Sequence, residues 1–307
     1  MDWTLFATQL LNGFQLGITL FLMSSGLTLV LGIMGFVNLA HGSFYMMGAY
    51  FAATAYQLTG SFLLAGLVAI PGTFLLGVLV DLICLRKLYE RDHLAQVLGT
   101  FGLLMFFNEL VRVIWGTAGI FASLPQVMMG TVELLPGIPY PTYRVLVLLV
   151  GVLTGAGLYL IIAHTRIGMV VRAGGTDRLM TAAMGVNIRL LGTFVFAAGA
   201  ALAGLAGFMA APLVAVQAGM GDPVLILTLV VIVIGGIGSI RGAVLASMLV
   251  GTVDTLGRVY FPALLGAAFS PAVSNALSPA VTSMMIYLIM AGILAYRPQG
   301  LLAARRG

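Results

Sequence analysis

A long stretch without ionised side chains at the start of the chain limits the fold most strongly. From Trp3 to Val80 the sequence contains no Asp, Glu, Lys or Arg. Over the whole chain 61% of the residues are hydrophobic and 7% are charged, whereas soluble domains carry about 25% charged residues. The apolar runs are continuous, as bilayer-crossing helices of about 20 residues require, and they lack the short alternation of barrel strands. The sequence therefore predicts an all-α polytopic membrane protein.

The apolar runs between charged residues predict about eight transmembrane helices in one transmembrane domain that covers residues 1–307. Glycine-broken or re-entrant segments are expected near 32–48 and 235–242, because glycine permits kinks and unwinding where a cavity is lined. The seventh run contains GGIGSIRG and is therefore a candidate for two shorter pieces. The expected spans are 8–33, 43–59, 62–85, 94–113, 143–163, 190–214, 223–257 and 279–296.

The distribution of basic residues predicts the orientation. The segments 86–93 and 164–189, the tail after Tyr296 and Arg241 together hold 11 of the 14 Lys and Arg residues. Alternating spans put these segments on one side, which the positive-inside rule identifies as the cytoplasm. The N-terminus, which does not resemble a cleaved signal peptide, is then expected outside, and the C-terminus in the cytoplasm. The external loop 114–142, with four prolines and one acid, is expected to form an ordered cap.

A polar island interrupts the first apolar region, with Asn38, His41 and Ser43 close together among glycines. One interpretation is a surface turn, in which Asn38 caps a helix and His41 is solvated. The other is a broken helix that lines a solute pathway, because paired glycine-broken segments in two halves of a chain are typical of transport sites. The second glycine-rich interruption, 235–242, is the observation behind the pathway interpretation, and the two interpretations can coexist in part. The predicted pathway residues are Asn38, His41, Gly42, Ser43, Gly235, Gly236 and Gly238.

The segment 164–189 is predicted to contain a short amphipathic helix. Thr176 or Asp177 is placed to cap it, its first turn begins near Arg178, and Gly185 is placed to end it. Such a helix lies along a membrane or docks into a groove of a partner. A solvated connector is the alternative.

The remaining polar residues have mainly structural interpretations. Small residues at intervals of four in 191–211 predict a face for close helix packing. Local contacts are expected for four carboxylates. Glu109 is expected to pair with Arg112, and Asp254 to form a surface pair with Arg258. Asp81 is expected at the membrane interface near Arg86, and Asp222 is expected to cap the next helix.

The sequence excludes or disfavours a disulfide, a cysteine-based metal cluster, a P-loop and a catalytic His–Ser pair. The single cysteine, Cys84, excludes an internal disulfide and a cysteine-based metal cluster. The only lysine, Lys87, is not in a P-loop, so the chain cannot cradle ATP phosphates by that motif. His41 and Ser43 could be imagined as base and nucleophile, but they are two residues apart and have no evident third member. No catalytic or metal-binding residue is predicted.

Four motifs, in order along the chain, resemble those of the Liv-type permease subunits of ABC importers for branched-chain amino acids. They are GIMGFVNLAHGSFYMMGAY (32–50), RAGGTDRLMTAAMGVNI (172–188), GGIGSIRGAVLASMLVG (235–251) and YRPQGLL (296–302). The resemblance implies a bacterial inner-membrane permease without a cofactor of its own. It implies that 164–189 is the cytoplasmic coupling segment, which engages the ATPase through Arg172, Ala173, Gly174, Asp177, Ala183, Gly185 and Val186.

The resemblance also implies partners. They are a second, related permease, two cytoplasmic ATPases that bind ATP and Mg²⁺, and a periplasmic solute-binding protein. Related permeases carry urea, short amides or aromatic acids, and these remain alternative solutes. An ATP-independent secondary transporter or channel is the other alternative, although the span centres lack the deep carboxylates typical of ion-coupled carriers.

Overall fold

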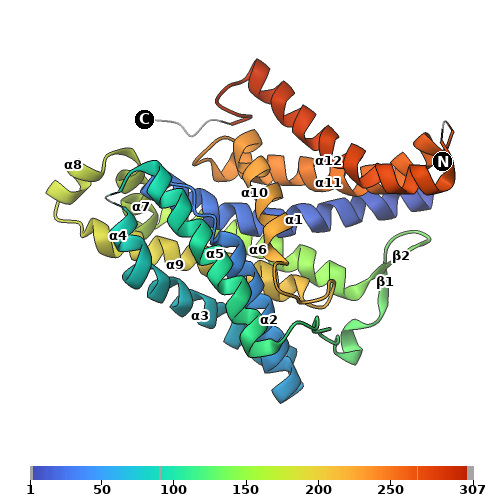
Figure 1. Cartoon of the computed structure of the whole chain (residues 1–307), viewed down its shortest axis with the longest axis horizontal. Coiled ribbons are helices and arrows are strands. Elements are labelled where there is room, and N and C mark those ends of the chain that lie inside the picture. The colour runs from blue at the N-terminus through green and yellow to red at the C-terminus, as the bar shows by residue number, and fades with distance from the viewer. Residues whose placement is uncertain (1–2, 90, 268, 303–307) are drawn as a thin grey trace. The chain divides into compact units, whose positions relative to one another are not determined.

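The computed structural model describes residues 3–89, 91–267 and 269–302. The chain is predominantly helical, as the sequence predicts (Figure 1). Arg305 and Arg306, which contribute to the predicted orientation, lie outside the described residues. The helices are α1 (Trp3–Met34), α2 (His41–Thr59), α3 (Phe62–Val80), α4 (Arg86–Leu88), α5 (His93–Trp115), α6 (Thr142–His164), α7 (Arg166–Thr176), α8 (Arg178–Ala183), α9 (Ile188–Ala210), α10 (Gly221–Gly235), α11 (Ile240–Gly266) and α12 (Pro271–Tyr296).

In the described part of the chain, seven helical stretches are long and apolar enough to cross a membrane. They correspond to all of the predicted spans except 43–59, while the seventh predicted span divides into the 15-residue α10 and the longer α11. The last helix begins at Pro271, eight residues before the predicted start of its span. Proline is well tolerated at the first helical position, so Pro271 starts the helix, whereas Pro279 lies within it.

The chain forms two compact units, each of which is discontinuous in sequence. The first contains residues 3–21, 126–152 and 227–302, and the second contains 22–125 and 153–226. Helices α1, α6 and α10 contribute residues to both.

The second unit is built around α2, which packs against both α3 and α9 (Figure 1). Its residues from His41 to Tyr50 are all buried. The predicted span 43–59 is therefore a core helix of this unit. This burial is compatible with its several polar and small residues, which would be unfavourable against lipid.

Glycine allows α2 and α9 to approach closely. A Cβ atom on Gly207 would overlap the carbonyl oxygen of Tyr45, and one on Gly48 would overlap the backbone of Gly204. On the same helix, a Cβ on Gly199 would lie 2.9 Å from the carbonyl oxygen of Gly26 in α1. The small-residue face predicted in 191–211 is thus confirmed.

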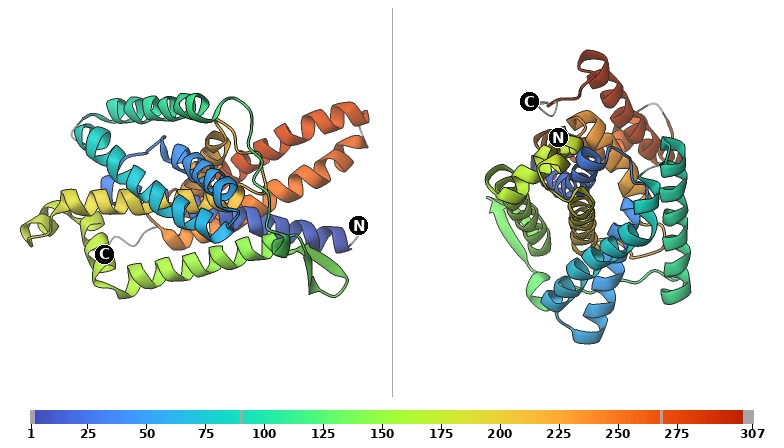
Figure 2. Two further views of the ribbon diagram at one scale, coloured as in Figure 1. Left: turned by 90° about the horizontal axis from the view of Figure 1, so that it is seen from below. Right: turned by 90° about the vertical axis from the view of Figure 1, so that its left-hand side faces the viewer.

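The first unit contains the α11–α12 pair and a β-hairpin. A Cβ on Gly13 of α1 would lie 2.8 Å from the Cα of Thr252 in α11, so these two helices are also in close backbone contact. Strands β1 (Thr131–Leu135) and β2 (Ile138–Pro141) pair antiparallel, with Val132 opposite Tyr140. Figure 2 shows this hairpin leading directly into α6. The predicted external loop 114–142 thus contains ordered structure.

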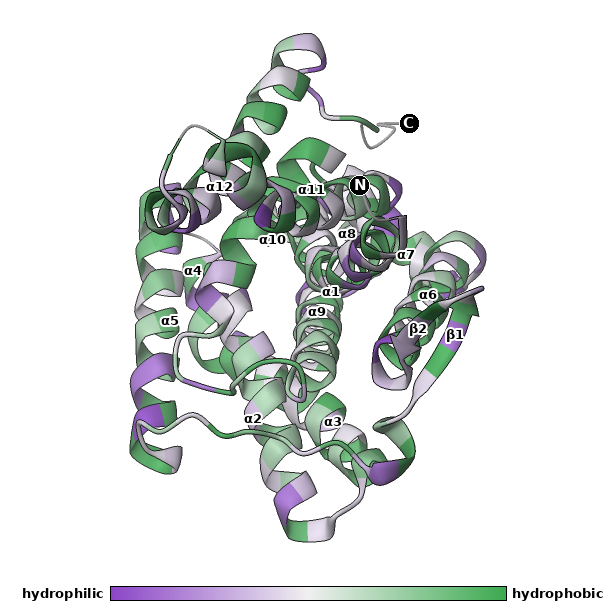
Figure 3. Cartoon of the chain, turned by 90° about the vertical axis from the view of Figure 1, so that its right-hand side faces the viewer, coloured by the Kyte–Doolittle hydropathy of each residue, from purple (hydrophilic) through white to green (hydrophobic). Residues whose placement is uncertain are grey.

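Exposure along the apolar helices indicates which of them face lipid. In the most apolar 18-residue stretch of α1, 83% of the residues are buried, whereas the corresponding figure is 11% for α6 and 17% for α12. Figure 3 shows hydrophobic residues along most of α5, with hydrophilic residues at one of its ends. Because apolar side chains are stable against lipid, these sparsely buried helices are suited to the periphery of a membrane protein.

Candidate transport pathway and coupling segment

The polar island lies at a break between two helices of the second unit. Helix α1 ends at Met34, Gly35 has a left-handed φ of +69°, and α2 starts at His41. The Asn38 side chain accepts a hydrogen bond of 3.0 Å from the Ala40 N–H, which forms an Asx turn. The predicted break is confirmed, but the capping interpretation is wrong. Ala40 occupies the N-cap position of α2, and Asn38 only shapes the turn before it.

The island is buried, which also rules out a solvated His41. His41 is 1% exposed, and its Nε2 lies 3.1 Å from the carbonyl oxygen of Met23. The Nδ2 of Asn38 and the Oγ of Ser43 have no hydrogen-bond partner among the described residues. The hydroxyls of Thr28 and Tyr50 in the same unit are likewise buried and unpartnered. Unsatisfied buried polar groups are uncommon in proteins, and each is a candidate for a bound water or ligand.

Large apolar side chains surround the start of α2. Phe44 is buried, and its ring centroid lies 5.6 Å from that of Phe196 and 6.2 Å from that of Phe107. Met46 and Met47 are buried in the same cluster. These side chains therefore pack between helices of the second unit.

The second glycine-rich break, in the first unit, holds the C-terminal segment. Gly236 and Gly238 have left-handed φ values of +99° and +82° between α10 and α11. The Leu301 N–H donates to the Ile234 carbonyl at 2.8 Å, and the Leu302 N–H donates to the Gly235 carbonyl at 3.2 Å.

Close backbone contact explains the glycines on both sides of this junction. A Cβ on Gly236 would lie 2.8 Å from the carbonyl oxygen of Gln299, and one on Gly300 would lie 2.6 Å from the Cα of Gly236. The structure thus joins two motifs, GGIGSIRG and YRPQGLL, that the sequence presents separately. The sequence contains the signal for each turn but none for their pairing.

The segment 164–189 lies in the second unit and contains two short helices. Thr165 caps α7 by accepting a hydrogen bond from the Gly168 N–H at 3.2 Å. Asp177 ends α7 and caps α8, since its side chain accepts from the Met180 N–H at 2.9 Å. Gly185, with a φ of +87°, follows α8. The predicted capped helix is confirmed, and Asp177, one of the two predicted candidates, is its cap.

The predicted coupling residues differ in exposure. Arg172, Ala173, Asp177, Ala183 and Gly185 are exposed, and Val186 is half-buried. Gly174 is buried, and a Cβ on it would lie 3.0 Å from the Leu191 side chain.

The exposed face of α8 also carries large apolar side chains. Leu179 is 85% exposed and Met184 is 79% exposed. Such side chains outside the apolar spans are suited to contact with another protein or with a membrane. The apolar periodicity of the segment includes Leu179, whereas no sequence pattern singles out Met184.

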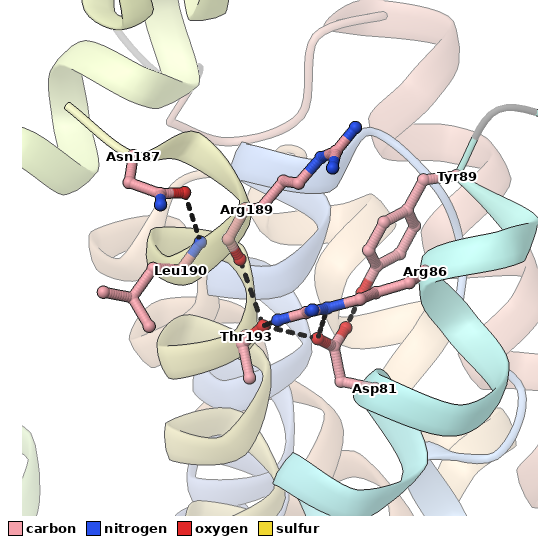
Figure 4. A network of polar contacts seen from close by, with 7 residues as sticks. All are labelled: Asp81, Arg86, Tyr89, Asn187, Arg189, Leu190 and Thr193. Atoms are coloured by element: carbon pink, nitrogen blue, oxygen red, sulfur yellow. Dashed lines mark hydrogen bonds and ion pairs between the residues drawn. The ribbon is translucent and has the colours of Figure 1, made fainter. Parts of the chain in front are cut away.

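Asp81 forms a buried polar network beside this segment (Figure 4). It lies in the π-helical turn η1 (Asp81–Leu85) and is 0% exposed. The Thr193 hydroxyl donates to its Oδ2 at 2.6 Å, the Tyr89 hydroxyl donates to its Oδ1, and the Arg86 Nε lies 3.7 Å from Oδ2. The predicted proximity of Asp81 and Arg86 is confirmed, and donors from distant segments bury the carboxylate within the second unit.

Two predicted local ion pairs are confirmed. Arg112 and Glu109 are 2.6 Å apart and well exposed. Arg258 and Asp254 are 2.8 Å apart. The second pair was predicted to lie at the surface, but only its arginine does. The Arg258 side chain is 51% exposed, whereas the Asp254 side chain is 6% exposed. Asp222 lies in the first turn of α10, where its Oδ2 accepts from Asn108 at 3.3 Å.

Comparison with known proteins identifies the family of the chain. Residues 9–294 match the family model described as "Branched-chain amino acid transport system / permease component". The chain is 29% identical over 271 residues to the high-affinity branched-chain amino acid transport system permease protein BraD of Pseudomonas aeruginosa, covering 82% of this chain and 86% of BraD. It is 28% identical over 315 residues to the corresponding LivH protein of Salmonella typhimurium, covering 96% of each.

An archaeal protein is also similar. The chain is 26% identical over 262 residues to the probable branched-chain amino acid transport permease protein LivH of Methanocaldococcus jannaschii, covering 81% of this chain and 80% of that protein. Because the family model extends over nearly the whole chain, including both glycine-rich breaks and the segment 164–189, this multi-pass membrane protein belongs to the branched-chain amino acid transport system permease component family.

Proposed function

We propose that the chain is the transmembrane subunit of an ABC importer that carries branched-chain amino acids. The observation that supports this most strongly is the family match over residues 9–294. The subunit pairs with a second, related permease. A periplasmic binding protein delivers the solute, and two cytoplasmic ATPases, which bind ATP and Mg²⁺, drive alternating access.

The proposed orientation follows the distribution of charge. The segments 86–93, 164–189 and the C-terminal tail face the cytoplasm of a bacterial inner membrane, because basic residues are retained on that side. The N-terminus and the hairpin-containing loop 114–142 face outward.

The proposed pathway includes the break before α2 and the break after α10. A zwitterionic amino acid needs donors for its carboxylate, acceptors for its ammonium group and an apolar surface for its side chain. In the second unit, the N-terminal end of α2, with the unpartnered Asn38 amide and Ser43 hydroxyl, offers polar groups for the first two. The pathway residues are Asn38, His41, Gly42 and Ser43, together with Gly235, Gly236 and Gly238 in the first unit.

The proposed docking segment for an ATPase is 172–186. The capped helix α8 presents Leu179 and Met184, both largely exposed, beside exposed Arg172 and Arg178. Burial of such apolar side chains in a groove of the ATPase would stabilise the complex by about 1.5–3 kcal/mol for each fully buried side chain. Gly174 and Gly185 shape the segment.

The test is purification of the tagged chain from its native membrane, followed by reconstitution of the complex in liposomes. We expect an ATPase and a second permease to co-purify, and leucine, isoleucine or valine uptake to require ATP and the binding protein. Thermal shift of the binding protein with leucine, valine, urea and aromatic acids identifies the solute. Uptake by the chain alone without ATP would contradict the proposal and support a secondary transporter.

A further inference from the structure

The buried carboxylate of Asp81 connects elements that are far apart in sequence. Its donors are Tyr89, eight residues away, and Thr193, 112 residues away in α9. Arg86 completes the network by donating from Nη2 to the Thr193 hydroxyl at 3.2 Å. The Asp81 side chain is fully buried, whereas that of Arg86 is 41% exposed. The two hydroxyl donors and Arg86 together connect α9 with η1.

Thr193 lies close to the exit of the coupling segment. Helix α9 starts at Ile188 immediately after Asn187, whose side chain caps the helix by accepting from the Leu190 N–H at 3.0 Å. Thr193 is therefore in the second turn after that cap. Figure 4 shows the Asn187 cap and the Thr193–Asp81 contact along the same end of α9, so a displacement of α8 that shifts this end of α9 against η1 would alter the Thr193–Asp81 contact.

Tyr89 connects the same carboxylate to the break before α2. Its ring centroid lies 5.6 Å from that of Phe36, which is buried between Gly35 and Asn38. Arg178, the first residue of α8, reaches the same place. Its Nη2 lies 3.5 Å from the position a Cβ would take on Gly35.

We propose that Asp81 and Tyr89 are positioning residues that transmit movement of the coupling segment to the polar island. The link runs from α8 through Thr193 and Asp81 to the Tyr89 ring, and from there to Phe36 and Asn38. It consists of two hydrogen bonds and one ring contact, joined by short stretches of backbone within one compact unit, and packed networks of this kind can carry coupling between two sites. This inference rests on the proposed function, because it needs an ATPase that moves α8.

The test compares Tyr89→Phe and Thr193→Val in the complete reconstituted importer. Each variant removes a donor to Asp81 while keeping nearly the same side-chain volume, and Tyr89→Phe keeps the ring against Phe36. We expect assembly and ATP hydrolysis within twofold of wild type. Solute moved per ATP should fall roughly tenfold, the effect expected for losing a hydrogen bond to a charged group. Thr193→Ser should restore the wild-type ratio.

A matched control is Thr100→Val in α5. Thr100 is also fully buried, but its hydroxyl donates only to carbonyls of its own helix, those of Gln96 and Val97 at 3.1 Å. We expect this variant to keep the wild-type ratio of solute to ATP. The comparison separates the effect of breaking this network from that of deleting any buried threonine hydroxyl.

Several outcomes would overturn the inference. A wild-type ratio of solute moved to ATP hydrolysed in either Tyr89→Phe or Thr193→Val would contradict it. A proportional fall in uptake and hydrolysis, or loss of the complex, would show that the network is only structural. Failure of the proposed function is distinguishable, since the wild-type complex itself would then show no ATP-dependent uptake.

Discussion

Replacement of glycine by alanine is expected to have opposite effects on stability at two positions of the second unit, because α2 and α9 are in close backbone contact at only one of them. Gly207 lies where a Cβ atom would overlap the Tyr45 carbonyl oxygen and come within 3.1 Å of the Ala49 nitrogen. These are backbone atoms, so they cannot rotate away as a flexible side chain can. At Gly102 of α5, a Cβ meets nothing among the described residues within 4 Å.

The expected change in the free energy of unfolding is the sum of two contributions, helix propensity and steric overlap. Alanine is favoured over glycine in a helix interior by about 1 kcal/mol, and this gain applies at both positions. Overpacking costs about 1–3 kcal/mol, and the upper end is expected at Gly207 because two helix backbones have to separate. We therefore expect Gly207→Ala to lower the free energy of unfolding by about 2 kcal/mol and Gly102→Ala to raise it by up to about 1 kcal/mol.

The assay is unfolding of the purified chain in mixed micelles by increasing amounts of sodium dodecyl sulfate. Far-UV circular dichroism follows the helices. In a Trp3→Phe background, fluorescence of Trp115, whose Nε1 donates to Thr54 at 2.8 Å, reports on the second unit. The difference between the two variants isolates the steric term, since the propensity term cancels. Equal stability of the two variants would refute the reasoning, as would a Gly207→Ala protein that is more stable than wild type.

Three further predictions concern the breaks and the coupling segment. Asn38→Leu and His41→Leu should each impair ATP-dependent uptake without loss of the assembled complex, because they remove the polar groups of the island; wild-type uptake by both would refute its role in the pathway. Asp177→Ala removes the α8 cap at a cost of about 1 kcal/mol, so the Met180 amide should exchange hydrogen about fivefold faster and solute uptake should fall, with Thr165→Ala, which uncaps α7, as comparison. Gly300→Ala forces a side chain into a left-handed conformation at a cost of about 1–2 kcal/mol and also brings its Cβ to 2.6 Å from the Gly236 Cα, so it should speed exchange of the Leu301 amide; unchanged exchange would show that the tail is not held at the α10–α11 break.

Much of the secondary structure was predictable because its signals are local. Continuous apolar runs identify helices long enough to span a bilayer, and the charged segments separate them. A side chain that caps a helix acts on an N–H two or three residues away, so Asp177 could be recognised without knowledge of the fold. Gly185 and Gly236 could likewise be recognised as positions suited to a left-handed backbone.

The candidate site was predictable only in part. The sequence indicates that Asn38, His41 and Ser43 interrupt an apolar region, but their burial depends on the helices that surround them. The same applies to Asp81, for which a local partner, Arg86, was evident and the donor from Thr193 was not. An ion pair read from sequence gives proximity along the chain, whereas burial depends on segments more than 100 residues away.

The sequence by itself determined the class of protein, the helical spans, the two glycine-rich breaks and the cap of α8, because hydropathy and backbone preference act over a few residues. Only the tertiary structure decided that α2 is a buried core helix, that the C-terminal segment pairs with the α10–α11 break, and that Tyr89 joins Asp81 to Phe36. Each of these depends on backbones or side chains from distant segments meeting at contact distance. No local pattern specifies which distant partner fills that space.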